Sequence, residues 1–364
     1  MRVTNSMLVN NLMRNLHTNL SSMSKLQDQL ATGRKFAHIS DDPVALVYSQ
    51  AARNKLARLA HYQGAVGSAG DWLNQAEVGV MELQKTIVNA YEAAVDSATN
   101  VKTPEDLQNL AKTAAQFRDH YLDTLNTTFG DKFVFGGYNT PGDPSVTLND
   151  KSIKAFTYEI DSTTGRRQLF YNGLNLSQFD GMLLTDYNNL NAGDPLPGGG
   201  TLSQRDFDAY SILKEDILTF DVGPGISMPV TMNGIELALF VTTDENGVSI
   251  IRDTYTVLDE LYRATEGVDV ATADDISAMI KPLQDAQNHL LTKTAEIGGR
   301  SRRLELLEAR YEQDFINYSR MKSDAEDVDM AEVIMNQKMA EAVLQAAMSA
   351  GARIIQPTLM DFLR

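Results

Sequence analysis

The stretch "QLATGRKFAHISDDPVAL" near the N-terminus gathers side chains that could do chemistry. His38, Ser40, Asp41 and Asp42 lie within five residues of one another, and Pro43 follows directly. Histidine and carboxylates bind metal ions and carry out acid–base catalysis, so either role is conceivable here. Both roles also need a second group of residues and a pocket, and the sequence shows neither.

A structural interpretation explains the same residues better. Pro43 is typical of the first residue of a helix, which makes Asp42 its N-cap and places Asp41 near the positive end of the helix dipole. Each of these effects stabilises a helix by about 1 kcal/mol. Gly33 is predicted to end the preceding helix, and His38 is then a packed or surface residue. We therefore predict that Gly33, Asp42 and Pro43 are helix boundaries.

No other motif predicts catalysis, a cofactor or a metal. The five histidines form no HExxH pair, and the GxSxG, GxxxxGK[ST] and GxGxxG patterns are missing. The "DENG" stretch lacks the later ligands of a calcium loop. The chain has no cysteine, which excludes disulfides, thiolate metal sites and cysteine nucleophiles. We predict no catalytic residue, no cofactor and no metal site.

Composition and charge narrow the possible partners. The 364 residues are 43% hydrophobic and carry a net charge of −16, which disfavours nucleic acid as a partner. Residues 140–262 hold 18 acidic against 7 basic side chains, whereas the first 40 residues hold 1 against 5. We expect a solvated surface in the middle of the chain and an acidic partner for its beginning.

Membrane insertion and a cleaved secretory signal are both disfavoured. No apolar run reaches the roughly 18–20 residues that span a bilayer. The N-terminal "MRVTNSMLVNNLMRNL" also lacks the apolar stretch of about 7–15 residues that a secretory signal contains. The chain is therefore expected either to stay in the cytosol or to be exported by a route that does not read such a signal.

Both ends of the chain show the apolar spacing of a helical seam. In the first 40 residues the spacing follows a heptad with Asn19 at the one polar position, and the C-terminal segment repeats apolar residues until it becomes rich in alanine. The expected N-terminal seam residues are Val9, Leu12, Leu16, Met23, Leu26 and Leu30. The expected C-terminal seam residues are Val328, Met335, Met339 and Leu344.

The interior also has two helical parts around a strand-rich middle. One heptad runs from Leu73 to Ala94, Thr103 begins a further helix, and apolar residues recur every seven positions from Ile276 to Tyr318. Pro282 should kink or delay that last helix. Residues 132–262 indicate short strands, with hairpins at Asp161–Gly165 and at Asn233-Gly234.

These elements predict a mainly α fold with an inserted β domain. Helices from the two ends of the chain would pair antiparallel as a coiled coil, and the strand-rich domain would lie at the far tip. The seam side chains of the terminal helices are few, and the C-terminal ones become small. We therefore expect the two terminal segments to be largely disordered alone and to fold when neighbouring copies bury their remaining faces.

Several motifs together resemble the flagellin superfamily. They are "MRVTNSMLVNN", "LQDQLATGRKF", "SDDPVAL", "KFVFGGYNT", "EIGGRSRRLELLEARY", "SDAEDVDMAEVIM" and "IIQPTLMDFLR". The resemblance covers roughly residues 1–138 and 255–364, whereas the insertion between them is not diagnostic. The "DDP" triplet and the short insertion favour the branch that joins the hook to the filament. Gly299 departs from the alanine expected there.

This resemblance implies a structural subunit of the bacterial flagellum at the hook–filament junction. It implies an inner coiled-coil domain (1–40 with 323–364), a helical-bundle domain (41–135 with 262–322) and an outer β domain (136–261). The implied partners are copies of the chain itself, a neighbouring hook-associated protein, flagellin, and an export chaperone at the C-terminal helix. Export would use the flagellar type III apparatus without a cleaved signal peptide.

Three alternatives remain open. A flagellin filament subunit would share the same motifs. A secreted coiled-coil adhesin or translocator would need an apolar membrane segment or a binding patch. An enzyme would need a pocket with converging polar groups inside the insertion.

Overall fold

A computed structural model describes residues 5–99, 103–130, 132–137, 147–148, 151–152, 154–162, 164–215, 217–244, 246–266 and 273–355. The outermost residues of the two end motifs, 1–4 and 356–364, lie outside this range. The chain divides into two compact units: residues 1–61 with 310–364, and residues 62–309. We call them the terminal unit and the central unit. The three-domain division expected from the sequence draws different boundaries and stays a prediction.

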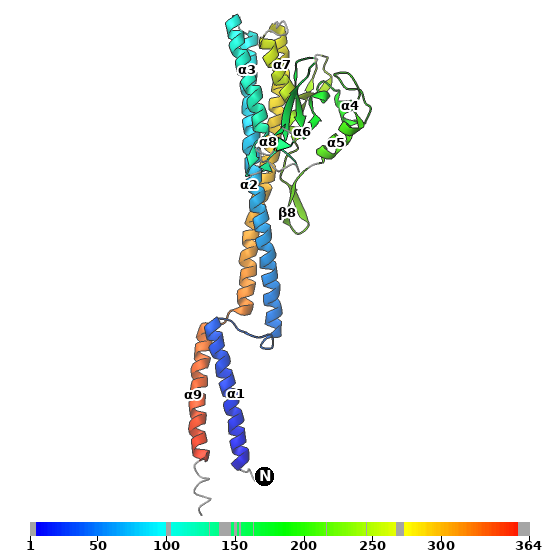
Figure 1. Cartoon of the computed structure of the whole chain (residues 1–364). Helices are drawn as coiled ribbons and strands as arrows, with labels where there is room; N and C mark the ends of the chain where they lie inside the picture. Colours follow the sequence, from blue (N-terminus) through cyan, green and yellow to red (C-terminus); the bar gives the residue numbers. More distant parts are fainter. Residues whose placement is uncertain are drawn as a thin grey trace, which may run out of the picture. The chain divides into compact units, whose positions relative to one another are not determined.

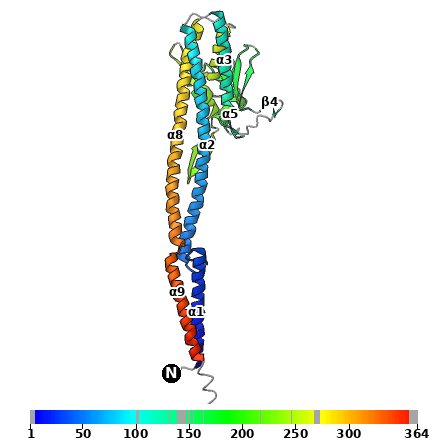
Figure 2. The same cartoon turned by 90° about the vertical axis from the view of Figure 1, so that its left-hand side faces the viewer.

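The terminal unit is built from helices contributed by both ends of the chain. Helices α1 (Asn5–Thr32) and α9 (Met330–Ile355) lie side by side in both views (Figures 1 and 2). The unit also contains the first turns of α2 (Pro43–Thr99) and the last turns of α8 (Ala273–Glu326). Lys55 Nζ lies 5.1 Å from the ring centre of Tyr318, which joins these two antiparallel helices.

The central unit contains the best-buried seam of the chain. All seven residues of the α2 heptad have side chains that are 0% exposed, so the predicted seam is confirmed. The matching α8 series is also buried from Ile276 to Tyr311, and Tyr318 is half-buried. The α2 seam residues are Leu73, Ala76, Val80, Leu83, Ile87, Ala90 and Ala94.

Two further helices complete the helical layer of the central unit. Helix α3 (Pro104–Leu125) packs along α7 (Thr254–Glu266). It begins with the capping box that the sequence predicts, because Thr103 accepts from the backbone N–H of Asp106 while the Asp106 carboxylate accepts from the Thr103 N–H. This start is confirmed.

The inserted region forms small antiparallel sheets among the described residues. The largest has the order β5–β6–β7, and β5 pairs with β6 across the predicted hairpin, in the register Phe156↔Tyr171 to Ile160↔Arg167. Its strands are β5 (Phe156–Ile160), β6 (Arg167–Tyr171) and β7 (Leu174–Asn175). The paired strands of the other sheets are β1 (Thr128–Phe129) with β2 (Lys132–Phe133), β3 (Thr147–Leu148) with β4 (Lys151–Ser152), β8 (Thr219–Gly223) with β9 (Ile226–Pro229), and β10 (Leu239–Thr243) with β11 (Ser249–Asp253). The short helices of this region are η1 (Ser177–Phe179), α4 (Leu184–Asn188), α5 (Gln204–Lys214) and α6 (Gly234–Ala238).

A buried ion pair ties the sheets to the helices. Arg118 on α3 donates to the Asp259 carboxylate on α7 at 2.5 Å, and both side chains are about 5% exposed or less. Asp259 also accepts the backbone N–H of Arg167 on β6. The Arg118 guanidinium lies 4.8 Å from the ring centre of Tyr262. The Asp259 carboxylate of α7 thus binds Arg118 of α3 and the backbone of β6 at the same time.

Two sequence expectations are wrong at single residues. Asn233-Gly234 is no hairpin turn: the Asn233 side chain accepts from the Ile235 N–H and caps α6. Gly234 is needed for packing, because a Cβ there would lie 2.5 Å from the ring of Tyr171. The delayed start that Pro282 could have caused is not found, because α8 begins nine residues earlier and runs through it; the expected kink stays a prediction. Burial of the surrounding seam outweighs the lost hydrogen bond.

The predicted fold class is confirmed: the chain is mainly helical, with short strands confined to one inserted region. Among the helices that the structure describes, none combines the length and apolar character that crossing a bilayer requires.

Candidate assembly interface

The seam residues predicted on α1 all lie on the face that meets α9. Each of them is half-buried, and Asn19 shares this face. Leu12 marks the closest approach of the two helices, because a Cβ on Gly351 of α9 would lie 2.8 Å from its Cδ2 atom. The half-buried residues are Val9, Leu12, Leu16, Met23, Leu26 and Leu30. Unlike the α2 seam, none of them is fully buried.

The C-terminal seam has a different register from the predicted one. Leu344 is half-buried on the α1 side, and Val328 is half-buried in the connection before α9. Met335 and Met339 are 57% and 56% exposed and lie outside the seam. This placement corrects the sequence prediction, which failed because α9 is apolar on several faces and periodicity alone could not choose among them. The residues of α9 that line the seam are Val333, Gln337, Ala340, Leu344, Ala347 and Gly351.

Helix α9 therefore carries a second apolar stripe. Met335, Met339 and Val343 are 51–57% exposed, and the alanines next to them are exposed as well. Their spacing of three, four and seven residues places them on one side of the helix, away from the seam. Soluble proteins rarely expose such continuous apolar surface unless it binds something. The α9 outer stripe consists of Met335, Met339, Ala342, Val343, Ala346 and Ala350.

The connection between α1 and α2 (residues 33–42) and the connection between α8 and α9 (residues 327–329) lie together. We call these two connections, with Glu326, the elbow. Gly33 follows α1 with φ of +68°, a conformation that glycine adopts without strain. The chain then pairs with the segment between α8 and α9: the Lys35 N–H donates to the Glu326 carbonyl at 2.7 Å, and the Val328 N–H donates to the Gly33 carbonyl at 3.1 Å. The elbow therefore needs both ends of the chain.

Glu326 is the centre of this elbow. Its side chain is 2% exposed and accepts from the Ser49 hydroxyl and from both Nε and Nη2 of Arg53, the latter at 2.8 Å. The Arg34 guanidinium lies 4.0 Å away. The hydrogen bond from Arg53 is the main reason that the pKa of Glu326 falls to about 2. A buried carboxylate thus links the elbow to the first turns of α2.

The cluster that opened the sequence analysis lies in the same elbow and acts as helix punctuation. Helix α2 begins at Pro43, and the Asp42 carboxylate accepts from the N–H groups of Val44 and Ala45 at 3.1 and 2.9 Å. Asp41 was expected to act through its charge near the start of α2, but its carboxylate also binds the segment before that helix. It accepts from the His38 N–H at 3.0 Å, which lowers its pKa to about 2 together with the ion pair to Lys25.

Sequence reasoning missed Glu326, Arg53 and Ser49. Glu326 lies inside an acidic run that predicts the start of a new helix. That helix, α9, does follow, and Asp329 caps it. No local pattern shows that one acid of this run is buried, because its partners lie more than 270 residues away. Only the tertiary structure brings them together.

The arrangement suits contact with other chains better than catalysis. In the part of the chain that the structure describes, no group of three or more histidine, cysteine, aspartate or glutamate side chains is arranged to hold a metal ion. The titratable groups of the elbow bind one another and the backbone. What this unit offers outward is the α9 outer stripe and the incompletely buried seam.

Comparison with known proteins relates the chain to proteins of the bacterial flagellum. Residues 3–140 match the family model described as the bacterial flagellin N-terminal helical region. The N-terminal helices α1 to α3 are therefore similar to the N-terminal helical region of bacterial flagellins.

The chain is similar to flagellar hook-associated protein 3 of Escherichia coli K12, with 21% identity over 96% of both chains. It is also similar to a flagellin of Clostridium tyrobutyricum, with 22% identity over 98% of this chain and all of the other. Among solved structures, a flagellar hook-associated protein from Vibrio parahaemolyticus has the same fold, with 16% identity and a TM-score of 0.54 over 79% of this chain and all of the other.

Proposed function

We propose that this chain is the flagellar subunit that joins the hook to the filament, and that its terminal unit is the assembly element. A relative named hook-associated protein 3 aligns over nearly the whole chain, which supports this role. The "DDP" triplet at the start of α2 supports it too. We assign the chain no catalytic activity and no cofactor.

The observation that carries the assembly role is a contrast in burial between two helix pairs of one chain. The α2 seam is 0% exposed throughout. The α1 seam is half-buried at every position, and α9 exposes a second apolar stripe. Each apolar side chain left half in water forgoes about 1 kcal/mol of the roughly 2 kcal/mol that full burial gives. Neighbouring copies would supply that burial.

The proposed partners follow from this role. Copies of the chain would cover the α9 outer stripe, a neighbouring hook-associated protein would contact the assembly on the hook side, and flagellin would stack on the other. Before export, a chaperone would shield the C-terminal helix. The apolar character of α9 supports such shielding, because mean hydropathy is higher there than in the other long helices. Export would proceed through the flagellar type III apparatus without a cleaved signal.

Met339→Asp tests the role of the α9 outer stripe. Met339 is 56% exposed in the single chain, so the new charge should leave the fold intact and block incorporation into the flagellum. Gln345→Asp is the matched control, because Gln345 is exposed on the same helix and lies on neither stripe. Labelled chains should appear as a narrow band at the hook end for the wild type and the control, and be missing for Met339→Asp.

Two outcomes would count against the proposal. Normal incorporation of Met339→Asp would exclude the α9 outer stripe as an interface. Label along the whole shaft would instead favour the second candidate, a filament subunit, which the full-length similarity to a flagellin supports. Growth of long filaments from the purified chain alone would also favour a filament subunit.

A further inference from the structure

Methionine supplies most of the apolar surface that α9 leaves exposed. Among the described side chains of this helix, six large apolar ones are exposed, and four of these are methionines. The unbranched thioether side chain of methionine adapts to many shapes, so it is common on surfaces that bind other chains. Two of the four, Met335 and Met339, belong to the α9 outer stripe. The four methionines are Met330, Met335, Met339 and Met348.

Thioether is the only kind of sulfur in this protein, because the chain has 15 methionines and no cysteine. Peroxides oxidise exposed methionine to methionine sulfoxide, which changes a flexible apolar side chain into a polar one. No thiolate competes for the oxidant in this chain. Exposed methionine is therefore the sulfur that a peroxide oxidises.

Exposure separates the methionines of the stripe from those of the core. Met335 and Met339 are 57% and 56% exposed, whereas Met228 is 0% exposed. Because Met335 and Met339 are four residues apart, they lie on one side of α9. A peroxide in solution therefore reaches this pair of sulfur atoms in the single chain and does not reach the core.

The α9 outer stripe has no group that could bind a sulfoxide oxygen. Its other members are alanines and Val343, whose side chains carry no hydrogen-bond donor. The backbone N–H groups of this part of α9 donate within the helix. Water supplies donors as long as the stripe is exposed. Once a neighbouring copy covers the stripe, that water is lost, and burial of an unpaired polar oxygen is unfavourable.

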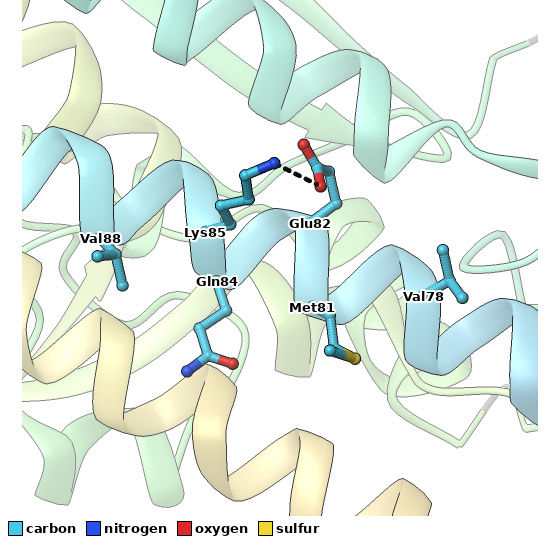
Figure 3. Close-up of a pocket in the computed structure, with 6 residues that line it drawn as sticks. All are labelled: Val78, Met81, Glu82, Gln84, Lys85 and Val88. Carbon is cyan, nitrogen blue, oxygen red and sulfur yellow. Dashed lines mark ion pairs between the residues drawn. The ribbon is translucent and has the colours of Figure 1, made fainter.

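Met81 is an exposed methionine in a different environment. It is 54% exposed on α2, in a groove that Gln84 and Lys85 also line. Figure 3 shows Met81 and Gln84 on the same side of the helix, while Lys85 pairs with Glu82 at 3.6 Å on the other side. The Gln84 amide can donate to a sulfoxide oxygen. Met81 therefore serves as a comparison for the two methionines of the stripe.

We propose that Met335 and Met339 form a redox-sensitive modification site, at which oxidation by a peroxide prevents neighbouring copies from covering the α9 outer stripe. Each thioether sulfur attacks one peroxide oxygen, the O–O bond breaks, and an S–O bond forms. The sulfur loses two electrons, and the second oxygen leaves as water after it takes up the proton of the first. The inference rests on the proposed function for the burial of the stripe and adds the chemistry that disables it.

The same geometry protects the assembled chain. Peroxide should convert Met335 and Met339 to sulfoxides in the dilute single chain, while Met228 stays unmodified. In isolated flagella the stripe is covered, so the same two methionines should oxidise at least about tenfold more slowly. Mass spectrometry of peptides from both samples measures the sulfoxide at each methionine.

A binding experiment tests the loss of assembly. Labelled full-length chain is treated with hydrogen peroxide, freed of excess peroxide, and added to flagella isolated from cells that lack this chain. Treated wild type should bind at least about tenfold less than untreated wild type. Its circular dichroism should stay unchanged, because the new oxygens face water in the single chain. Reduction by methionine sulfoxide reductases for both epimers should restore binding.

Two double variants show which methionines are responsible. Met335→Leu combined with Met339→Leu keeps the size and the apolar character but removes the sulfur, so this chain should bind before and after peroxide. Met81→Leu combined with Met321→Leu is the matched control, because these methionines are 54% and 47% exposed outside the stripe. The control should lose binding after peroxide as the wild type does.

Normal binding by wild type that carries both sulfoxides would overturn the inference. Equal loss of binding in the variant without Met335 and Met339 would overturn it as well. Binding of untreated chain is the separate test of the proposed function. Untreated chain that fails to bind flagella would refute that function and the inference with it, whereas untreated chain that binds and resists peroxide would refute the inference alone.

Discussion

Removing the charge of Glu326 should loosen the elbow while leaving the central unit intact. Glu326→Gln keeps the size of the side chain. However, it places two N–H donors where Ser49 and Arg53 already donate. The charge-assisted bonds to Arg53 are lost, and the buried site gains a donor without an acceptor.

The magnitude follows from the burial of the two partners. Breaking a buried ion pair is destabilising by about 3–5 kcal/mol. Glu326 is 2% exposed, but the Arg53 side chain is 42% exposed and can regain water, so we expect about 2–3 kcal/mol here. That loss corresponds to amide hydrogen exchange about 30- to 150-fold faster at the elbow.

Hydrogen exchange read by mass spectrometry measures this directly. The informative amides are Lys35 and Val328, whose hydrogen bonds close the elbow. Glu332→Gln is the matched control, because Glu332 is exposed in the first turn of α9, six residues after Glu326. Unchanged exchange in Glu326→Gln, or equal effects of both variants, would refute the role of this carboxylate.

The same carboxylate predicts a pH dependence. The pKa of Glu326 lies at about 2 in the folded chain, below its ordinary value of 4.5. Its contribution is therefore fully present above about pH 4.5 and is lost as the pH falls toward 2. Elbow exchange, corrected for the intrinsic rate, should accelerate over that window in the wild type and stay level in Glu326→Gln. A wild type without acceleration would contradict the prediction.

Three further predictions concern separate parts of the chain. Arg118→Leu leaves the buried Asp259 unpaired and should lower the stability of the central unit by about 3–5 kcal/mol, which thermal unfolding followed by circular dichroism measures; a change below 1 kcal/mol would contradict it. Gly234→Ala brings a methyl group into the ring of a buried tyrosine and should cost about 1–3 kcal/mol in the same assay, where an unchanged midpoint would show that the ring can move. Leu344→Asp should weaken the α1–α9 seam and block incorporation, whereas Met339→Asp should block incorporation only; exchange in α1 distinguishes them, and equal exchange would contradict the corrected register.

The parts of the fold that the sequence predicts are those where the signal lies in the spacing of neighbouring residues. The α2 seam from Leu73 to Ala94 repeats apolar residues at a strict three–four spacing and is buried as the heptad indicates. The Thr103 start has both halves of its capping box within four residues. Such signals are local, and therefore the sequence carries them in full.

The register of α9 could not be predicted in the same way. Met335 and Leu344 both fit apolar stripes, and only contact with α1 shows which stripe is the seam. The presence of two stripes is itself the signal of an interface, since a helix that pairs with one neighbour needs only one.

The elbow and Asn233 were missed for a different reason. Glu326 binds residues that lie far away in the sequence, so no spacing indicates its burial. Asn233-Gly234 has the composition of a hairpin turn, but the Asn233 side chain caps a helix and Gly234 accommodates two aromatic rings. An Asn-Gly dipeptide can form a hairpin turn or begin a helix, and tertiary packing determines which of the two occurs here.

The central claim is that α1 and α9 lack enough buried apolar surface alone and gain the rest from neighbouring copies. Hydrogen exchange of α1 and α9, compared with residues 73–94 of α2, tests it in dilute single chains and again in isolated flagella. We predict that α1 and α9 exchange many-fold faster than α2 in the single chain and become equally protected in the flagellum. Protection of α1 and α9 equal to that of α2 in the dilute single chain would contradict the claim.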